Sequence, residues 1–142
     1  MSSIDLHAKL GFTNVLSLTT ISSDTDTLSS GVKVVDVDDS TLSFEGNVIA
    51  LKTETITDGN YTLSLEDDDN PAFSAPVTVP LDQTKGIDGV TLTSTSSDSV
   101  FKIGYTGDKN NFRLKITSTS TSTGGEFSAM AVQSNATVGP VL

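Results

Sequence analysis

Residues 100–116 read Val100-Phe-Lys-Ile-Gly-Tyr-Thr-Gly-Asp-Lys-Asn-Asn-Phe-Arg-Leu-Lys-Ile116, and this stretch decides the fold that we expect. Large apolar side chains recur at every second position on both sides of a polar turn. They are Phe101, Ile103 and Tyr105 before the turn, and Phe112, Leu114 and Ile116 after it. The turn itself is rich in Gly, Asp and Asn, which tolerate positive φ angles. Alternation on both arms of such a turn predicts a β-hairpin. Lys102, Arg113 and Lys115 would then share its outer face.

The pattern of alternating strands and polar turns recurs upstream. Val48–Ile56 and Tyr61–Leu65 flank Asp58-Gly59, and Asp-Gly between two β-rich runs predicts a second hairpin. A further alternating set is Val77, Val79 and Leu81, and prolines occupy positions 76 and 80. Because proline cannot donate to a sheet ladder, we expect this run at a sheet edge.

Residues 117–123 alternate Ser and Thr and are followed by two glycines. They extend the second arm of the first hairpin beyond its apolar positions. Since neither face is apolar, nothing fixes the register of this part internally. We therefore expect an extended hairpin whose outer half projects from the domain and can pair with another chain; the alternative is a flexible loop.

Short strands with frequent turn signals and no helical periodicity predict an all-β fold, an antiparallel β-sandwich. The sequence predicts about eight strands, and both immunoglobulin-like and jelly-roll topologies accommodate that number. The 20 serines and 21 threonines agree, because Thr favours strands and both residues disfavour long helices. A chain of 142 residues most simply forms one domain. We assign residues 1–20 to an extended N-terminal arm or first strand and residues 21–142 to the sandwich.

The charge of the chain restricts its partners. Its formal net charge is −10 and its pI is about 4.2, which argues against nucleic acid and against an anionic membrane surface. The sequence has no Cys and no run long and apolar enough for a transmembrane helix. The N-terminus lacks the basic and apolar regions of a signal peptide, so we expect synthesis and folding in the cytoplasm.

Catalytic motifs are missing from the sequence. His7 is the only histidine, which leaves too few ligands for a His-based zinc site, and no Gly-x-Ser-x-Gly motif accompanies it. The carboxylates lie mainly in solvated runs, and no aromatic cluster forms the floor of a sugar cleft. We therefore expect a protein that is not an enzyme and has no cofactor.

Calcium is the chemical alternative. Hard cations take six to eight oxygen ligands, and Asp67, Asp68, Asp69 and Asn70 offer such oxygens in one loop. Asp24 and Asp26 are a second candidate pair. Neither loop matches an EF-hand or a calcium-binding repeat. The alternative is that both are charged loops that remain hydrated.

Three motifs resemble, in this order, a family of small structural proteins of tailed bacteriophages. The first is Thr57-Asp-Gly-Asn-Tyr-Thr-Leu-Ser-Leu-Glu-Asp-Asp-Asp69 and the second is Ile103-Gly-Tyr-Thr-Gly-Asp-Lys-Asn-Asn-Phe-Arg-Leu-Lys-Ile116. The third is Thr123-Gly-Gly-Glu-Phe-Ser-Ala-Met-Ala-Val132. The resemblance covers roughly residues 30–140. It departs from the family at Asn110-Asn111, where a basic residue more often leads into the aromatic one.

The resemblance implies a capsid decoration (cement) protein, located on the outside of the virion. Its partners would be the major capsid protein and copies of itself, in a homotrimer rather than a dimer. Apolar residues outside the sandwich pattern need a partner, so we expect Ile4, Leu6, Leu10 and Phe12 to bind the capsid. A tail or neck component and a carbohydrate-adhesion module of the virion are the alternatives. An interaction domain of unknown context remains a further alternative.

Overall fold

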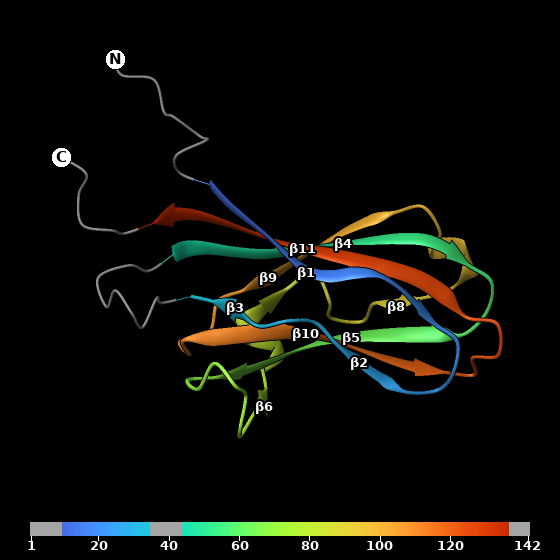
Figure 1. The fold of residues 1–142 in the computed structure, drawn as a ribbon, viewed down its shortest axis with the longest axis horizontal. Coiled ribbons are helices and arrows are strands. Elements are labelled where there is room, and N and C mark those ends of the chain that lie inside the picture. Colours follow the sequence, from blue (N-terminus) through green and yellow to red (C-terminus); the bar gives the residue numbers. More distant parts are fainter. Residues whose placement is uncertain (1–9, 35–43, 137–142) are drawn as a thin grey trace, which may run out of the picture.

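The computed structural model describes residues 10–34 and 44–136, which form two antiparallel sheets that pack against each other (Figure 1). The strands of sheet A are β1 (Leu10–Ile21), β4 (Phe44–Ile56), β7 (Thr84–Lys85), β9 (Val100–Tyr105) and β11 (Gly125–Ala136). The strands of sheet B are β2 (Asp26–Leu28), β3 (Val32–Lys33), β5 (Asn60–Asp68), β6 (Val77–Thr78), β8 (Thr91–Leu92) and β10 (Asn111–Thr119). Two 3-10 turns, η1 (Leu81–Gln83) and η2 (Ser94–Ser96), lie between strands. The predicted all-β sandwich is confirmed.

Within each sheet, most adjacent strands are far apart in the sequence. Sheet A runs β1-β11-β4-β9-β7, and sheet B runs β2-β10-β5-β6, with β3 beside β10 and β8 beside β5. The predicted edge position is confirmed for Val77–Thr78, because β6 lies at the edge of sheet B and pairs there with β5, whereas Leu81 begins η1. Residues 10–21, part of the segment expected as an arm or first strand, form edge strand β1 and pair with β11.

The core lies between the sheets and follows the period-two pattern of the sequence. In β5, Tyr61, Leu63 and Leu65 are buried, while Thr62 and Ser64 between them are not. Two aromatic pairs join the sheets: Tyr61 lies 4.8 Å from Phe127, and Tyr105 stacks on Phe112 at 4.5 Å between ring centroids. The largest fully buried side chains are Tyr61, Phe112, Phe127, Ile49, Leu51, Leu65, Leu92, Ile103, Leu114, Ile116 and Thr53.

The hairpin predicted for residues 100–116 is wrong, although both of its strands exist. β9 lies in sheet A between β4 and β7, whereas β10 lies in sheet B between β2 and β5. Their apolar faces therefore meet across the core, as the stacked rings of Tyr105 and Phe112 show. Alternation identifies the residues that point inward. It does not show whether the next strand lies beside the first in the same sheet or opposite it in the other sheet. Residues 106–110 supply enough chain to cross the roughly 10 Å between packed sheets.

The second predicted hairpin is wrong for the same reason. β4 belongs to sheet A and β5 to sheet B, so the Asp58-Gly59 turn crosses from one sheet to the other. Gly59 has a φ of +96°, the conformation for which an Asp-Gly pair is a signal. This conformation serves a connection between sheets as well as a turn within one sheet.

The projecting hairpin expected at residues 117–123 is also wrong. Thr117 to Thr119 continue β10 and pair with β5 at Thr62 to Asn60. Ser118 is only 2% exposed, and its hydroxyl lies 2.7 Å from the Ser23 carbonyl and 2.9 Å from the Thr25 N–H. A small hydroxyl whose hydrogen bonds are satisfied can be buried, so the polar sequence does not imply exposure.

Candidate protein-binding surface

Sheet A carries exposed apolar side chains on its outer face. Directly opposite residues of antiparallel strands point to the same side, and the register places Phe12, Val132 and Val48 in one row across β1, β11 and β4. The residues next to this row in sequence, Ile49 and Ala131, point into the core. Phe12 is 61% exposed. We call this side of sheet A, with its row of three apolar residues, the outer face.

Further apolar residues lie along the outer face, next to Lys52 and Lys102. Met130 of β11 lies opposite Ala50 of β4, and Val100 of β9 lies beyond them opposite Lys52. Met130 and Val100 are both exposed. These residues line a shallow hollow of about 260 Å³. Exposed apolar surface that extends over several strands is typical of a surface that another protein covers.

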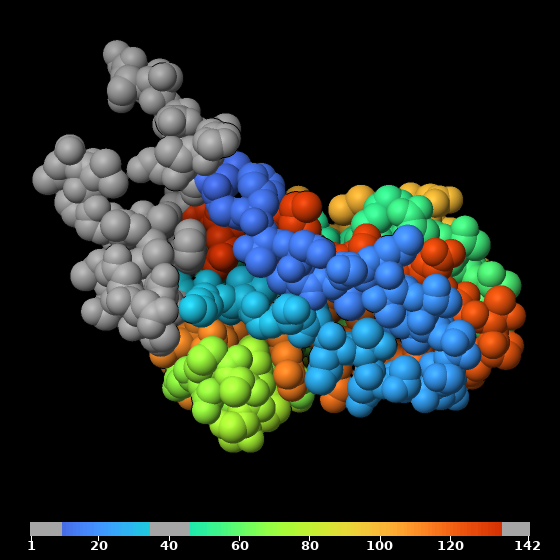
Figure 2. Space-filling model, viewed as in Figure 1, coloured from blue at the N-terminus to red at the C-terminus, as the bar shows by residue number. Residues whose placement is uncertain are grey.

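Strand β1 gives the outer face an uncharged edge. No charged residue and no proline occurs from Leu10 to Ile21, although charges and prolines commonly protect exposed edges. On the side away from β11, the Val15 carbonyl accepts a hydrogen bond of 2.8 Å from the Ser30 N–H. Register shifts between Asn14 and Thr19 interrupt the pairing with β11. Bulges of this kind twist the strand and limit indiscriminate pairing with other chains. Leu10 to Asn14, which pair with β11 without a register shift, are the more regular part of β1. Figure 2 shows β1 (blue) at the surface.

The outer face of sheet A carries one ion pair, Lys52–Glu54 at 3.4 Å, and the outer side of sheet B carries two. Arg113 lies 3.0 Å from Glu66, and its guanidinium stands 4.4 Å from the ring centroid of Phe73. Lys115 lies 3.6 Å from Asp26. The expectation that Lys102 shares a face with these two cations is wrong, because Lys102 lies on sheet A. Separation of β9 and β10 between the sheets explains this difference.

The four predicted capsid-binding residues are placed as follows. Leu10 and Phe12 lie in β1, where they point to the outer face, Leu10 half-buried and Phe12 exposed. Ile4 and Leu6 lie outside the described residues, as does His7. Sequence reasoning missed Val48, Met130, Val132 and Val100, because only the strand register brings them beside Phe12.

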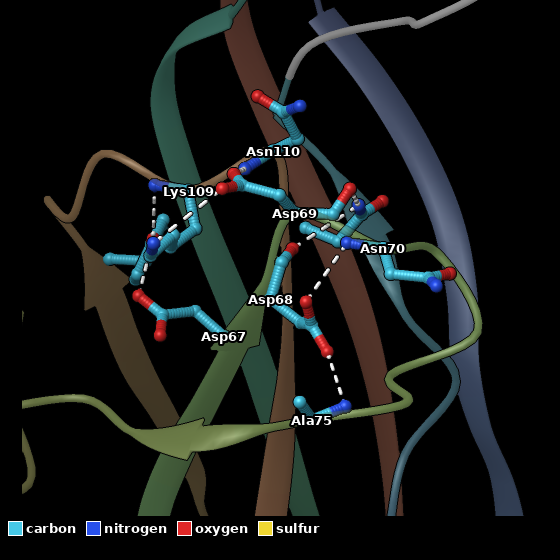
Figure 3. Close-up of polar contacts among 9 residues, drawn as sticks. Asp67, Asp68, Asp69, Asn70, Ala75, Lys109 and Asn110 are labelled. Atoms are coloured by element: carbon cyan, nitrogen blue, oxygen red, sulfur yellow. Dashed lines mark hydrogen bonds and ion pairs between the residues drawn. The ribbon is translucent and has the colours of Figure 1, made fainter.

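The acidic run proposed for calcium lies at the end of β5 and in the loop after it, and hydrogen bonds within the protein engage it (Figure 3). The Asp68 carboxylate accepts from the N–H groups of Asn70 and Ala75, both at 2.9 Å. These two bonds hold the pKa of Asp68 below its usual value. Asp69 accepts from the Asn110 N–H at 3.1 Å. Among the described residues no three His, Cys, Asp or Glu side chains form a group suited to a metal ion.

Asp67 does not join this loop, because its side chain points into the molecule. It is 5% exposed, and it accepts a hydrogen bond of 2.8 Å from the Tyr105 hydroxyl of the opposite sheet. Burial, with the carboxylate beside it, raises the pKa of Tyr105 far above its ordinary value. The Asn70 side chain instead turns to its own loop, where it accepts from the Ala72 N–H and lies 3.0 Å from the Ser74 hydroxyl.

At the opposite end of the sandwich, Asp58 organises the connection between β10 and β11. Its carboxylate accepts from the Ser122 hydroxyl at 2.7 Å and from the N–H groups of Ser122, Thr123 and Gly124. The Ser122 hydroxyl, then the Thr123 and Gly124 N–H groups, lower the pKa of Asp58 well below its ordinary value. These contacts lie among turns and shape the scaffold of the protein.

Comparisons with family models, with curated protein sequences and with solved structures found no match to this chain. In the described part of the chain, no helix has the length and apolar character needed to span a membrane. The outer face of sheet A offers apolar side chains and an uncharged strand edge for contact with another protein.

Proposed function

We propose that this protein is a capsid decoration (cement) protein that binds the outer surface of the major capsid shell and stabilises it. Phe12 on the outer face of sheet A carries the proposal, because it combines a large apolar side chain with 61% exposure. Buried aromatic anchors dominate the energetics of protein interfaces. The row of Phe12, Val132 and Val48 gives a partner a continuous apolar contact.

The proposal assigns the two sheets different roles. The outer face of sheet A, with its exposed apolar row, contacts the capsid, and the outer side of sheet B faces solvent on the outside of the virion. Synthesis takes place in the host cytoplasm. The acidity of the chain keeps the unbound protein soluble until shells are assembled. No bond is made or broken, since the role is mechanical.

Binding of point variants to shells tests the proposal. Phe12→Asp should lower the affinity for heads that lack this protein by at least about tenfold, because the interface would bury an unpaired carboxylate. Val77→Asp is the matched control: Val77 is also 61% exposed but lies on sheet B. Co-sedimentation and cryo-electron microscopy measure binding. Equal binding of both variants, or wild-type protein that leaves heads bare, contradicts the proposal.

We further propose that the protein binds as a homotrimer. Three copies that engage neighbouring capsid subunits multiply weak individual contacts through effective concentration. Light scattering during size-exclusion chromatography should give three times the chain mass of 14.8 kDa. A monomer that still decorates shells would overturn the trimer while leaving the decoration role in place.

A further inference from the structure

Lys85 and Lys102 differ from most cations of the described chain because no carboxylate of the described residues pairs with them. Lys52, Lys109, Arg113 and Lys115 each have a carboxylate oxygen within 3.0–3.6 Å. Lys85 and Lys102 are both exposed, in a chain with 18 acidic residues against 8 Lys and Arg. Within residues 10–34 and 44–136, these two lysines therefore have no carboxylate partner, and their charges are open to an external anion.

The strand register brings these two lysines together. Lys85 of β7 lies directly opposite Gly104 of β9, and Lys102 is two residues along β9, on the same outer face. Diagonal neighbours of this kind stand about 7–8 Å apart. The Lys85 stem passes over Gly104, where a Cβ added to the glycine would lie 3.1 Å from the Lys85 Cβ. Two like charges on neighbouring side chains repel each other, and an anion between them would relieve the repulsion.

A hollow of about 480 Å³ lies beside the two lysines. Its lining includes Gly46, Val48, Lys85, Gly86, Lys102 and Gly104, and most of the lining surface is apolar. Three of these residues are glycines, so backbone atoms form the wall of the hollow at their positions. Val48 also belongs to the row that begins with Phe12, so the hollow is continuous with the outer face. The hollow thus combines apolar walls with a positive rim.

We propose that this hollow binds an acidic segment of a protein partner that alternates carboxylate and apolar side chains. The carboxylates would pair with Lys85 and Lys102, and the apolar side chains would pack beside Val48. The inference deepens the proposed function and rests on it for the identity of the partner as the major capsid protein.

The test uses the isolated full chain without capsids, so its failure is distinguishable from failure of the decoration role. An N-acetylated, C-amidated hexapeptide that alternates valine and glutamate is titrated to millimolar concentration against ¹⁵N-labelled protein. We expect amide shifts at Lys85, Gly86 and Gly104, and smaller shifts at high salt. A peptide with lysine in place of glutamate should leave these amides unshifted.

The double variant Lys85→Glu/Lys102→Glu should weaken binding of the acidic peptide by about tenfold or more, because both ion pairs become repulsive. Lys33→Glu/Lys115→Glu is the control with the same change in net charge, on sheet B. Thermal melts of each variant show whether it is folded. No amide shifts with the acidic peptide, equal weakening in both double variants, or equal shifts with a thymidine oligonucleotide would overturn the proposal.

Discussion

Asp58 illustrates how one side chain can organise a whole connection of this fold. Its two carboxylate oxygens receive three backbone N–H groups and one hydroxyl from residues 122–124. Charge-assisted bonds of this kind are stronger than those between neutral groups. The sequence identified Asp58 only as a turn residue, because its partners lie more than sixty positions away and come near it through the packing of the sheets.

Asp58→Asn should lower the melting temperature at neutral pH, and the difference from wild type should shrink steadily as the pH falls below about 4. The folded-state pKa of Asp58 is lowered from 3.8, so its stabilising effect is complete above the unfolded pKa and is lost as pH falls towards the folded value. Thermal melts between pH 7 and pH 2 test this. Asp88→Asn, at an exposed turn position, is the control. A difference that stays constant with pH would contradict this role.

Tyr105 and Tyr61 provide a matched pair of buried hydroxyl groups. Tyr105 donates to the buried Asp67 carboxylate, whereas Tyr61 donates to the Asp58 carbonyl at 2.9 Å. Tyr105→Phe should lower the free energy of unfolding by about 1–3 kcal/mol, because it leaves a buried carboxylate without its donor. Tyr61→Phe should cost less, about 0.5–1.5 kcal/mol. Urea denaturation measures both. An equal or larger loss in Tyr61→Phe would show that the bond to Asp67 has no special weight.

At the scale of elements, the connections between sheets impose the strictest backbone requirements. Gly124 has a φ of +97°, and a Cβ there would overlap the Ile21 carbonyl and lie 2.8 Å from the Ser22 Cα. Gly89 also has a positive φ, +72°, but a Cβ there would meet nothing within 4 Å. A substitution at Gly89 therefore measures the cost of the positive φ alone. A substitution at Gly124 adds the cost of a Cβ that overlaps the neighbouring backbone.

Gly124→Ala should destabilise the protein by at least about 3 kcal/mol, because strain and overlap with backbone act together. Gly89→Ala should cost only about 1–2 kcal/mol, the penalty for a left-handed conformation alone. Chemical denaturation of the two variants gives the comparison. Similar losses at both sites would mean that the connection at Gly124 relaxes freely.

The strands themselves were largely predictable from sequence, and their partners were not. Period two identified the inward side chains of β5, β9 and β10 correctly, because burial of one sheet face imposes that period. This period is the same whether the next strand lies beside it in the same sheet or opposite it across the core, so both hairpin predictions failed. The candidate surface could also be predicted only in part, because the sequence does not reveal which strands are neighbours. Phe12 was predicted from its apolar character, but Val48, Lys85 and Lys102 join it only through strand register.

At the scale of the whole molecule, strands that follow each other in sequence lie mainly in opposite sheets. Their partners within a sheet are consequently remote: β1 pairs with β11, and β5 pairs with β10. The chain must close long loops before these contacts form, and loop closure costs entropy that early contacts do not yet offset. Topologies dominated by such pairings fold slowly.

We therefore expect refolding from urea on the scale of milliseconds to seconds. The chain has no Trp and two Tyr, both in the core, so intrinsic tyrosine fluorescence in a stopped-flow instrument reports formation of the core. Tyr61 lies against Phe127 and Tyr105 against Phe112, and each ring pair joins opposite sheets, so the signal follows their packing. Full recovery of fluorescence within microseconds would contradict the expectation. Such fast recovery would mean that the connections between sheets, such as the one that Asp58 holds, are already formed in the unfolded chain. Most of the entropy cost of long-range pairing would then be absent from folding.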